Sequence, residues 1–324
     1  MPDFEKGAAG ASPGGVLGGW RYWSTKKKVM VASLFLFIII ALAVGLGVGL
    51  GVGLSRGGGG GGEGEETPPP PTGTTAAKWQ PPVGTTWQIE LLYPLNDTSV
   101  DADVYDIDLF NNNASTIKQL QDQGRRVICY FSAGSYENWR PDKDKFKSSD
   151  LGNKLKGWDG ERWLDLTSTN VRNIMVSRLD LAREKGCDGV DPDNVDGYEK
   201  DNDSGLDLTM ADAADFVNFL ANETHARNMS IGLKNAGGII PSVIGNMQWS
   251  VNEQCALYDE CDTYDPFIEA GKPVFHIEYP KGDDTNNNSP VTTAQKISAC
   301  AFSGPRNFST IIKNMDLDNW IETC

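Results

Sequence analysis

Residues 186–198 read GCDGVDPDNVDGY and predict a short buried strand that runs out into a loop rich in carboxylates. Asp191 and Asp193 are two positions apart, so in an extended chain they point to the same side. Pro192 donates no hydrogen bond to a neighbouring strand and is expected to end it. Like charges this close raise the pKa of a carboxyl, as acid–base catalysis requires. A calcium loop is the alternative, but it would end in a bidentate Glu, which the run up to Tyr198 does not supply.

Strand-like and helical stretches alternate along the chain around this motif. Helices are predicted over 114–123, 171–185 and 209–227, each followed by Gly or Asn. Alternation implies a parallel sheet, and eight strands close a barrel, so we predict an α/β fold of the (β/α)8 TIM-like type. A doubly wound open sheet is the alternative, although no Gly-rich phosphate loop follows the first strand. The predicted strands are 88–92, 104–110, 126–132, 162–166, 189–193, 230–235, 248–253 and 273–279.

The long gap at 134–161 is expected to form an irregular loop over the mouth of the barrel. The barrel domain is expected to span residues 85–324. Before it, residues 1–28 read as a cytoplasmic tail, 29–54 as a single transmembrane signal anchor, and 55–84 as a flexible Gly/Pro-rich linker. The basic flank of the anchor is N-terminal, which predicts a single-pass type II protein in the cell membrane, with the catalytic domain extracellular.

Charge is distributed unevenly between these parts. Residues 1–28 contain five basic and two acidic residues, a net charge of +3, so the remainder of a chain of net charge −15 carries −18. An acidic body argues against nucleic acid as a partner, because phosphates need a basic surface. It suits a neutral or cationic ligand.

The cysteines and sequons favour an oxidising, secretory location. Six cysteines allow fifteen pairings. Two pairs look local, Cys255 with Cys261 and Cys300 with Cys324, which leaves Cys129 and Cys187 as the remainder. Seven Asn-x-Ser/Thr sequons, some of them expected by chance, predict a glycoprotein; they begin at Asn96, Asn113, Asn202, Asn222, Asn228, Asn287 and Asn307.

Polar side chains gather where the predicted strands end. In a (β/α)8 barrel the ligand binds at the carboxyl ends of the strands, and buried polar groups without a role there would cost stability. Aromatic side chains such as Trp87 could stack on sugar rings. The strand-end candidates are Asp106, Asp108, Asn111, Tyr130, Ser132, Asp165, Asp191, Asp193, Asn194, Lys234, Asn235, Asn252, Glu253, His276, Glu278 and Tyr279.

The sharpest pair is Glu253 with an aspartate of 189–193. The predicted strands that carry them are two places apart, which brings inward-pointing carboxyls to roughly 5–9 Å of each other. That range covers both retaining and inverting glycosidases. A salt bridge from Glu253 to Lys234 is the structural alternative. Two carboxylates are sufficient for glycoside hydrolysis without a cofactor.

Other chemistries fit less well. The chain has two histidines, His225 and His276, and His225 lies on a helix that reads as barrel exterior. One histidine near the mouth cannot supply a His-rich zinc site, so we expect no metal. No Gly-x-Ser-x-Gly motif is present.

Five phrases, in this order, resemble glycoside hydrolase family 114, the endo-α-1,4-polygalactosaminidases. They are VYDIDLF (104–110), VICYFSAGSYE (127–137), DGVDPDNVDGY (188–198), GLKN (232–235) and VNEQC (251–255). Within that family the chain is similar to the membrane-anchored fungal enzyme acting on galactosaminogalactan. The resemblance implies a (β/α)8 barrel that cleaves α-1,4-linked galactosamine internally, in a cationic cell-surface polysaccharide.

The resemblance also carries residues over. Asp193 matches directly, whereas Asp191 stands where many relatives have Glu, so either could be the partner of Glu253. Asp188, Asn194, Tyr130, Lys234, Asn235, Glu278, Trp87 and Asp106 are expected to shape the mouth and bind substrate. Two other functions remain as alternatives: a non-catalytic carbohydrate-binding barrel at the cell surface, and a metal-dependent polysaccharide deacetylase.

Overall fold

The computed structural model describes residues 78–282, 285–301 and 306–324. The expected tail and membrane anchor, and the expected linker up to residue 77, lie outside the described residues. Within the described ranges, no helix is both long enough and apolar enough to cross a bilayer.

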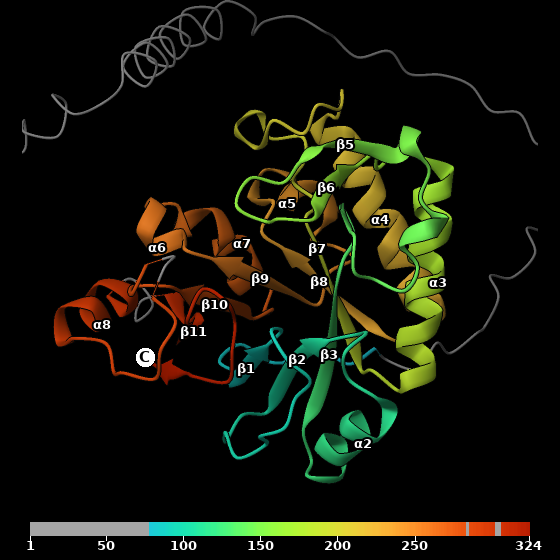
Figure 1. The fold of residues 1–324 in the computed structure, drawn as a ribbon. Helices are drawn as coiled ribbons and strands as arrows, with labels where there is room; N and C mark the ends of the chain where they lie inside the picture. Colours follow the sequence, from blue (N-terminus) through green and yellow to red (C-terminus); the bar gives the residue numbers. More distant parts are fainter. Residues whose placement is uncertain (1–77, 283–284, 302–305) are drawn as a thin grey trace, which may run out of the picture. The chain divides into compact units, whose positions relative to one another are not determined.

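A curled nine-stranded sheet dominates the described part of the chain (Figure 1). Eight neighbouring strands run parallel, and β12 (Glu322–Thr323) pairs antiparallel with the last of them. This α/β arrangement is consistent with a TIM-like barrel. In sheet order the parallel strands are β1 (Trp87–Glu90), β2 (Val104–Asp108), β3 (Arg126–Ser132), β7 (Gly189–Asp193), β8 (Ser230–Lys234), β9 (Trp249–Glu253), β10 (Val274–Glu278) and β11 (Ser309–Ile312).

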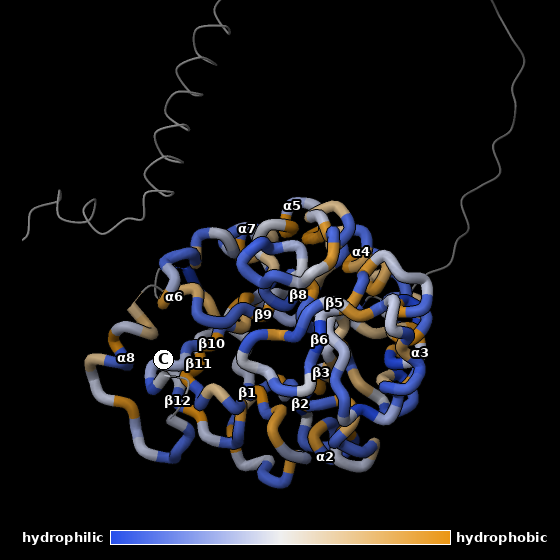
Figure 2. Tube along the Cα trace, turned by 45° about the horizontal axis from the view of Figure 1, so that its top comes forward, coloured by the Kyte–Doolittle hydropathy of each residue, from blue (hydrophilic) through white to orange (hydrophobic). Residues whose placement is uncertain are grey.

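The three predicted helices form close to their expected bounds, because each has a cap. They are α2 (Ala114–Asp122), α3 (Thr169–Lys185) and α4 (Met210–Ala226), with side-chain N-caps from Asn113, Ser168 and Thr209. Their sequences mix hydrophobic and hydrophilic segments (Figure 2), as expected for helices with one face on a sheet. The remaining helices are short: α5 (Ile240–Val243), α6 (Cys255–Tyr258), α7 (Asp265–Glu269) and α8 (Thr293–Cys300).

The prediction of a main-sheet strand at 162–166 is wrong. That stretch falls in a separate three-stranded antiparallel sheet, ordered β4 (Ser135–Glu137), β6 (Glu161–Leu164), β5 (Leu151–Lys154). β3 pairs directly with β7 instead. The small sheet occupies the region expected to be an irregular loop, and it starts directly after the carboxyl end of β3. The eighth parallel strand is β11, the four residues STII, for which no strand was predicted.

Close packing inside the sheet explains two glycines of the strands. A Cβ on Gly232 would lie 2.0 Å from Trp249 Nε1, and one on Gly189 would lie 2.5 Å from Trp249 Cη2. The Trp249 side chain is fully buried beside Phe275. Glycine in β7 and β8 therefore leaves room for the indole between these strands.

All six cysteines form disulfides, in the pairing that the sequence analysis left as one option. Cys129 of β3 joins Cys187 just before β7, Cys255 joins Cys261, and Cys300 joins Cys324. The first bond crosses between neighbouring strands, and the second closes the short segment directly after Glu253.

Candidate active site

A cavity of about 380 Å³ opens where the parallel strands end. Its floor is polar and comes from the last residues of β3, β7, β8 and β9, while the small sheet supplies one wall. Trp139 and Trp158 stand at the cavity with about half of their surface exposed. The lining residues are Leu91, Leu92, Asp108, Asn111, Tyr130, Glu137, Trp139, Arg140, Leu155, Trp158, Glu161, Asp193, Asn194, Asp196, Lys234, Asn235, Glu253, Met315, Asp316 and Leu317.

Lys234 lies at the centre of the floor, between two carboxylates. Its Nζ is 3.0 Å from Asp193 Oδ2 and 3.1 Å from Glu253 Oε2. The lysine side chain is 2% exposed, whereas the side chains of Asp193 and Glu253 are 15% and 23% exposed. Burial alone would lower the pKa of Lys234, but the three carboxylates around it, those of Asp193, Glu253 and Asp191, raise it well above its usual value. The lysine is therefore a permanent cation under the cavity.

Glu253 is held from three sides. Tyr279 OH donates to its Oε1 at 2.5 Å, Asn235 Nδ2 donates to its Oε2 at 3.0 Å, and Lys234 contacts the same Oε2. Burial would raise the pKa of Glu253, but Lys234 and these hydrogen bonds outweigh burial and lower it. The glutamate is therefore ionised and fixed in orientation.

Asp193 is held by the strands on either side of it. Tyr130 OH donates to Asp193 Oδ2 at 2.9 Å from β3, and Lys234 reaches the same oxygen from β8. The backbone N–H of Asn194 donates to Asp193 Oδ1 at 2.7 Å. Asn194 adopts a left-handed conformation, with φ 61°, where the chain turns away from β7. The Lys234 ammonium also lies 5.5 Å from the centre of the Tyr130 ring.

Asp191 lies below the cavity and not in its lining. It is fully buried, as is Asp106 of β2, and the two carboxyls interact with each other. Among the described residues, none of their four carboxyl oxygens has a hydrogen-bond partner. Burial, with repulsion from Asp193 and Glu253, raises the pKa of Asp191 to about 7, against the opposing effect of Lys234. Burial and Asp191 raise the pKa of Asp106 well above its usual value. Of the two candidate aspartates, Asp193 is the one that faces the cavity with Glu253.

Three further candidates also lie away from the cavity lining. Asp188 sits at the other end of β7, where it accepts hydrogen bonds from Arg126 and the Val127 N–H. Trp87 is buried against Phe275, and its Nε1 donates to the backbone. Glu278 is buried and accepts from the backbone N–H of Ala256. The prediction that these three residues lie at the mouth is wrong, because the polar group of each side chain has its hydrogen-bond partner inside the fold.

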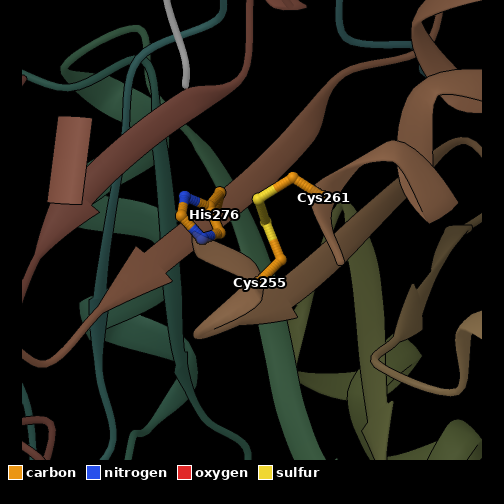
Figure 3. Close-up of side chains that lie close together, drawn as sticks. All are labelled: Cys255, Cys261 and His276. Carbon is orange, nitrogen blue, oxygen red and sulfur yellow. A yellow bond between two sulfur atoms is a disulfide. The ribbon is translucent and has the colours of Figure 1, made fainter. Parts of the chain in front are cut away.

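Glu278 instead fastens the segment that follows Glu253. Its Oε1 is 3.0 Å from His276 Nε2. Figure 3 shows His276 beside the Cys255–Cys261 disulfide. In the described part of the chain, these three residues are the one group of possible metal ligands, but both sulfur atoms are already used in the disulfide. The arrangement therefore positions the end of β9 and offers no thiolate.

The small sheet contributes residues that the sequence did not single out. Arg140 Nη2 is 2.6 Å from Asp108 Oδ2 and 2.7 Å from Glu137 Oε1. Glu161 faces the cavity from the start of β6. Outside the small sheet, Tyr279 directly follows β10. It was predicted only as one of the polar residues at strand ends, yet its hydroxyl donates a hydrogen bond to Glu253. No local motif marks this wall, because it assembles from a segment that reads as an irregular loop.

The raised pKa of Asp191 predicts a stability that depends on pH. The folded chain retains a proton that an unfolded aspartate, with a pKa of 3.8, releases. The carboxyl therefore destabilises the fold progressively as pH rises from about 4 to about 7. Asp191→Asn should unfold at a higher temperature than the parent protein at pH 8, with the difference shrinking toward pH 4.

The expected gain at pH 8 is at most on the order of 4 kcal/mol, since the pKa rises by about three units and one unit corresponds to about 1.4 kcal/mol. Thermal unfolding across this pH range measures it. Asp207→Asn, which removes an exposed carboxylate, serves as the control and should give no such trend. A pH-independent difference for Asp191→Asn would contradict the assignment.

Comparisons with known proteins agree with this geometry. The profile of glycoside-hydrolase family GH114 matches residues 68–324. The crystal structure of Aspergillus fumigatus Ega3 in complex with galactosamine is 74% identical, covers 77% of this chain and 98% of its own, and superposes with a TM-score of 0.75. The glycoside hydrolase domain of PelA from Pseudomonas aeruginosa, at 13% identity, covers 74% of this chain and 98% of its own, with a TM-score of 0.57, and shows the same fold. The comparison with curated protein sequences gives no match. The chain belongs to glycoside-hydrolase family GH114.

Proposed function

We propose that the protein is an endo-acting hydrolase that cleaves α-1,4-linked galactosamine in a cationic, galactosaminogalactan-like cell-surface polysaccharide. The observation that carries the proposal is the pair Asp193 and Glu253, bridged by Lys234 on the floor of the cavity. Two carboxyl groups facing one cavity are what hydrolysis of a glycosidic bond needs. Family membership favours hydrolysis over the carbohydrate receptor and the metal-dependent deacetylase.

The substrate follows from charge and from the similar structure. Ega3, which is 74% identical, has been crystallised with galactosamine. The cavity lining contains seven carboxyl groups against the two cations Arg140 and Lys234; they are Asp108, Glu137, Glu161, Asp193, Asp196, Glu253 and Asp316. A polymer with free amines is partly cationic and is attracted by such a field.

The separation of the two carboxyls supports a retaining mechanism. Because both oxygens contact the same Nζ, at 3.0 and 3.1 Å, they lie at most about 6 Å apart. Retaining glycosidases have carboxyls about 5–5.5 Å apart, and inverting ones about 6.5–9.5 Å. One carboxyl protonates the leaving oxygen while the other attacks the anomeric carbon. Water then releases the glycosyl group from the enzyme, activated by the first carboxyl.

Removing either member of the pair should abolish depolymerisation. Glu253→Gln and Asp193→Asn keep the shape of each side chain and remove the charge and the acid–base function. We expect each to reduce the release of new reducing ends from deacetylated polymer by at least about 1,000-fold. Asp191→Asn, which changes the carboxyl below the cavity, should retain much more activity.

The same assay separates the alternatives. A Glu253→Gln variant with near-normal turnover would refute the catalytic pair. A parent protein that binds the polymer without producing reducing ends would be a receptor. Release of acetate from acetylated polymer, blocked by a chelator, would indicate the deacetylase.

The first product should keep the α configuration at its new reducing end, because two inversions at the anomeric carbon restore it. Proton NMR of a concentrated digest, recorded within minutes of adding enzyme and before mutarotation, reports the anomer. An initial β signal would show that a water molecule attacks directly and that the carboxyls move apart when substrate binds.

We also infer that the sheet closes as a (β/α)8 barrel between β1 and β11. Support comes from bonds across this seam: Trp87 Nε1 donates to Ser309 O at 2.8 Å, and Lys313 Nζ donates to Gln88 Oε1 at 3.0 Å. The backbone N–H of Leu91 donates to Leu317 O at 3.0 Å. A crystal structure with these two strands apart would contradict closure.

A membrane-tethered, extracellular location is proposed from the sequence. The basic tail before the apolar run 29–54 favours a type II orientation, and the three disulfides suit an oxidising compartment. Adding protease to intact cells that express the full chain should remove a C-terminal epitope and spare an N-terminal one. A peptide:N-glycosidase should also lower the mass of the body if the sequons are used. Protection of the C-terminal epitope would contradict this orientation.

A further inference from the structure

The cations of the cavity are each committed to particular carboxylates. Arg140 contacts Asp108 and Glu137 at 2.6 and 2.7 Å. Lys234 contacts the two carboxylates of the catalytic pair. Among the described residues, no lysine, arginine or histidine forms an ion pair with Glu161, although this glutamate lines the same cavity.

Glu161 is held in place by the small sheet and by a hydrogen bond. It opens β6 directly opposite Glu137 of β4, and it is only 8% exposed. Its Oε2 accepts from Ser135 Oγ at 2.6 Å. Like charges directly opposite each other destabilise a sheet, and here only Glu137 is neutralised by arginine. Burial, and to a smaller extent Glu137 and Asp193, raise the pKa of Glu161 to about 7, against the opposing effects of the Ser135 bond and of Arg140, whose contacts are with Asp108 and Glu137. An incoming cation would relieve this cost.

Glu161 is also connected to the catalytic floor. Ser135 Oγ, which donates to Glu161, accepts from Asn194 Nδ2 at 3.2 Å. The backbone N–H of the same Asn194 donates to Asp193. This short chain of hydrogen bonds connects Glu161 to Asp193, and both residues line the cavity that would hold the sugars on either side of the scissile bond.

We propose that Glu161 binds the free ammonium group of a galactosamine residue next to the scissile bond, and so sets the preference of the enzyme for deacetylated over N-acetylated polymer. The inference rests on the proposed function, and it assigns recognition of the substrate's amine to Glu161. An N-acetyl group offers no positive charge to Glu161. It would leave a buried carboxylate without a counter-ion, which is costly.

Two other cavity carboxylates without an ion pair in the described residues, Asp196 and Asp316, fit this role less well. Both side chains are more exposed than that of Glu161, so water and salt screen their charges more strongly, although burial also raises the pKa of Asp196, to about 6. They contribute to the general negative field, which attracts a cationic polymer without reading individual sugars. The buried position of Glu161 is what makes its single charge selective.

Glu161→Gln tests the proposal because it keeps the acceptor for Ser135 and removes only the charge. On deacetylated polymer, we expect KM to rise about 10- to 100-fold, the usual value of a charge-assisted hydrogen bond, with a smaller change in kcat. The ratio of kcat/KM on deacetylated to partly acetylated polymer should fall at least tenfold. Glu184→Gln removes an exposed carboxylate on α3 and should change none of these values.

Monomeric sugars give a second readout that does not depend on turnover. Galactosamine should inhibit the parent enzyme more strongly than galactose does. The two sugars should inhibit the Glu161→Gln variant equally. Glu161→Asp keeps the charge on a shorter side chain and should retain part of the preference. Thermal unfolding of Glu161→Gln should be no lower than that of the parent, because an uncompensated buried charge is removed.

The outcomes separate this inference from the proposed function. A parent enzyme without reducing-end release would overturn the function itself. An active parent with unchanged polymer selectivity and sugar preference in Glu161→Gln would overturn the role of Glu161 alone. A lower unfolding temperature with unchanged selectivity would show that Glu161 is structural, which also overturns the proposal.

Discussion

A buried lysine ammonium between two carboxylates is the interaction on which the site depends. Without Lys234, Asp193 and Glu253 would be like charges at most about 6 Å apart in a partly desolvated cavity, where repulsion is strong. The lysine fixes both side chains on one floor and offsets part of their charge. In return, the carboxylates keep the lysine charged although it is 2% exposed. Burial of each of these three charges costs less free energy because the opposite charge lies beside it. They can lie so close because they come from neighbouring strands.

The order of the strands brings these three residues together. The order of the three strands that carry them could be predicted, although one other strand was misplaced. β7, β8 and β9 are neighbours in the sheet, so Asp193, Lys234 and Glu253 end side by side. The stretch 162–166 was counted among the sheet strands and β11 was missed, but both errors lie outside this run of three. Hydrophobic alternation cannot distinguish a strand of the main sheet from a strand of a small covering sheet, because both have one buried face. The covering sheet, and with it Arg140 and Glu161, therefore escaped prediction.

The second property that could not be predicted from the sequence is how deep below the cavity each side chain lies. Asp191 and Asp193 point to the same side of β7, as their spacing predicts, but they are about 6.6 Å apart along the strand. That rise carries the chain from a sealed layer, where Asp191 meets Asp106, to the open floor, where Asp193 meets Tyr130 and Lys234. Alternation gives the face of a residue and says nothing of its level in the layers of a curled sheet. Mouth positions expected for Asp188 and Trp87 failed for the same reason, since both lie at the amino ends of their strands.

The protonation state of each carboxyl group also depends on the layer in which it lies. Among the described residues, no cation forms an ion pair with the lower layer, Asp106 and Asp191, and burial there outweighs the effect of Lys234 and favours protonated carboxyls. One level up, Lys234 and directed hydrogen bonds hold Glu253 ionised. On the cavity wall, Glu161 lacks a cation of its own and keeps a raised pKa. Carboxyl groups thus take two electrostatic states within one site: ionised where Lys234 is in contact, and raised in pKa where no cation is in contact among the described residues. A cationic sugar completes this pattern, whereas a neutral one leaves the wall uncompensated.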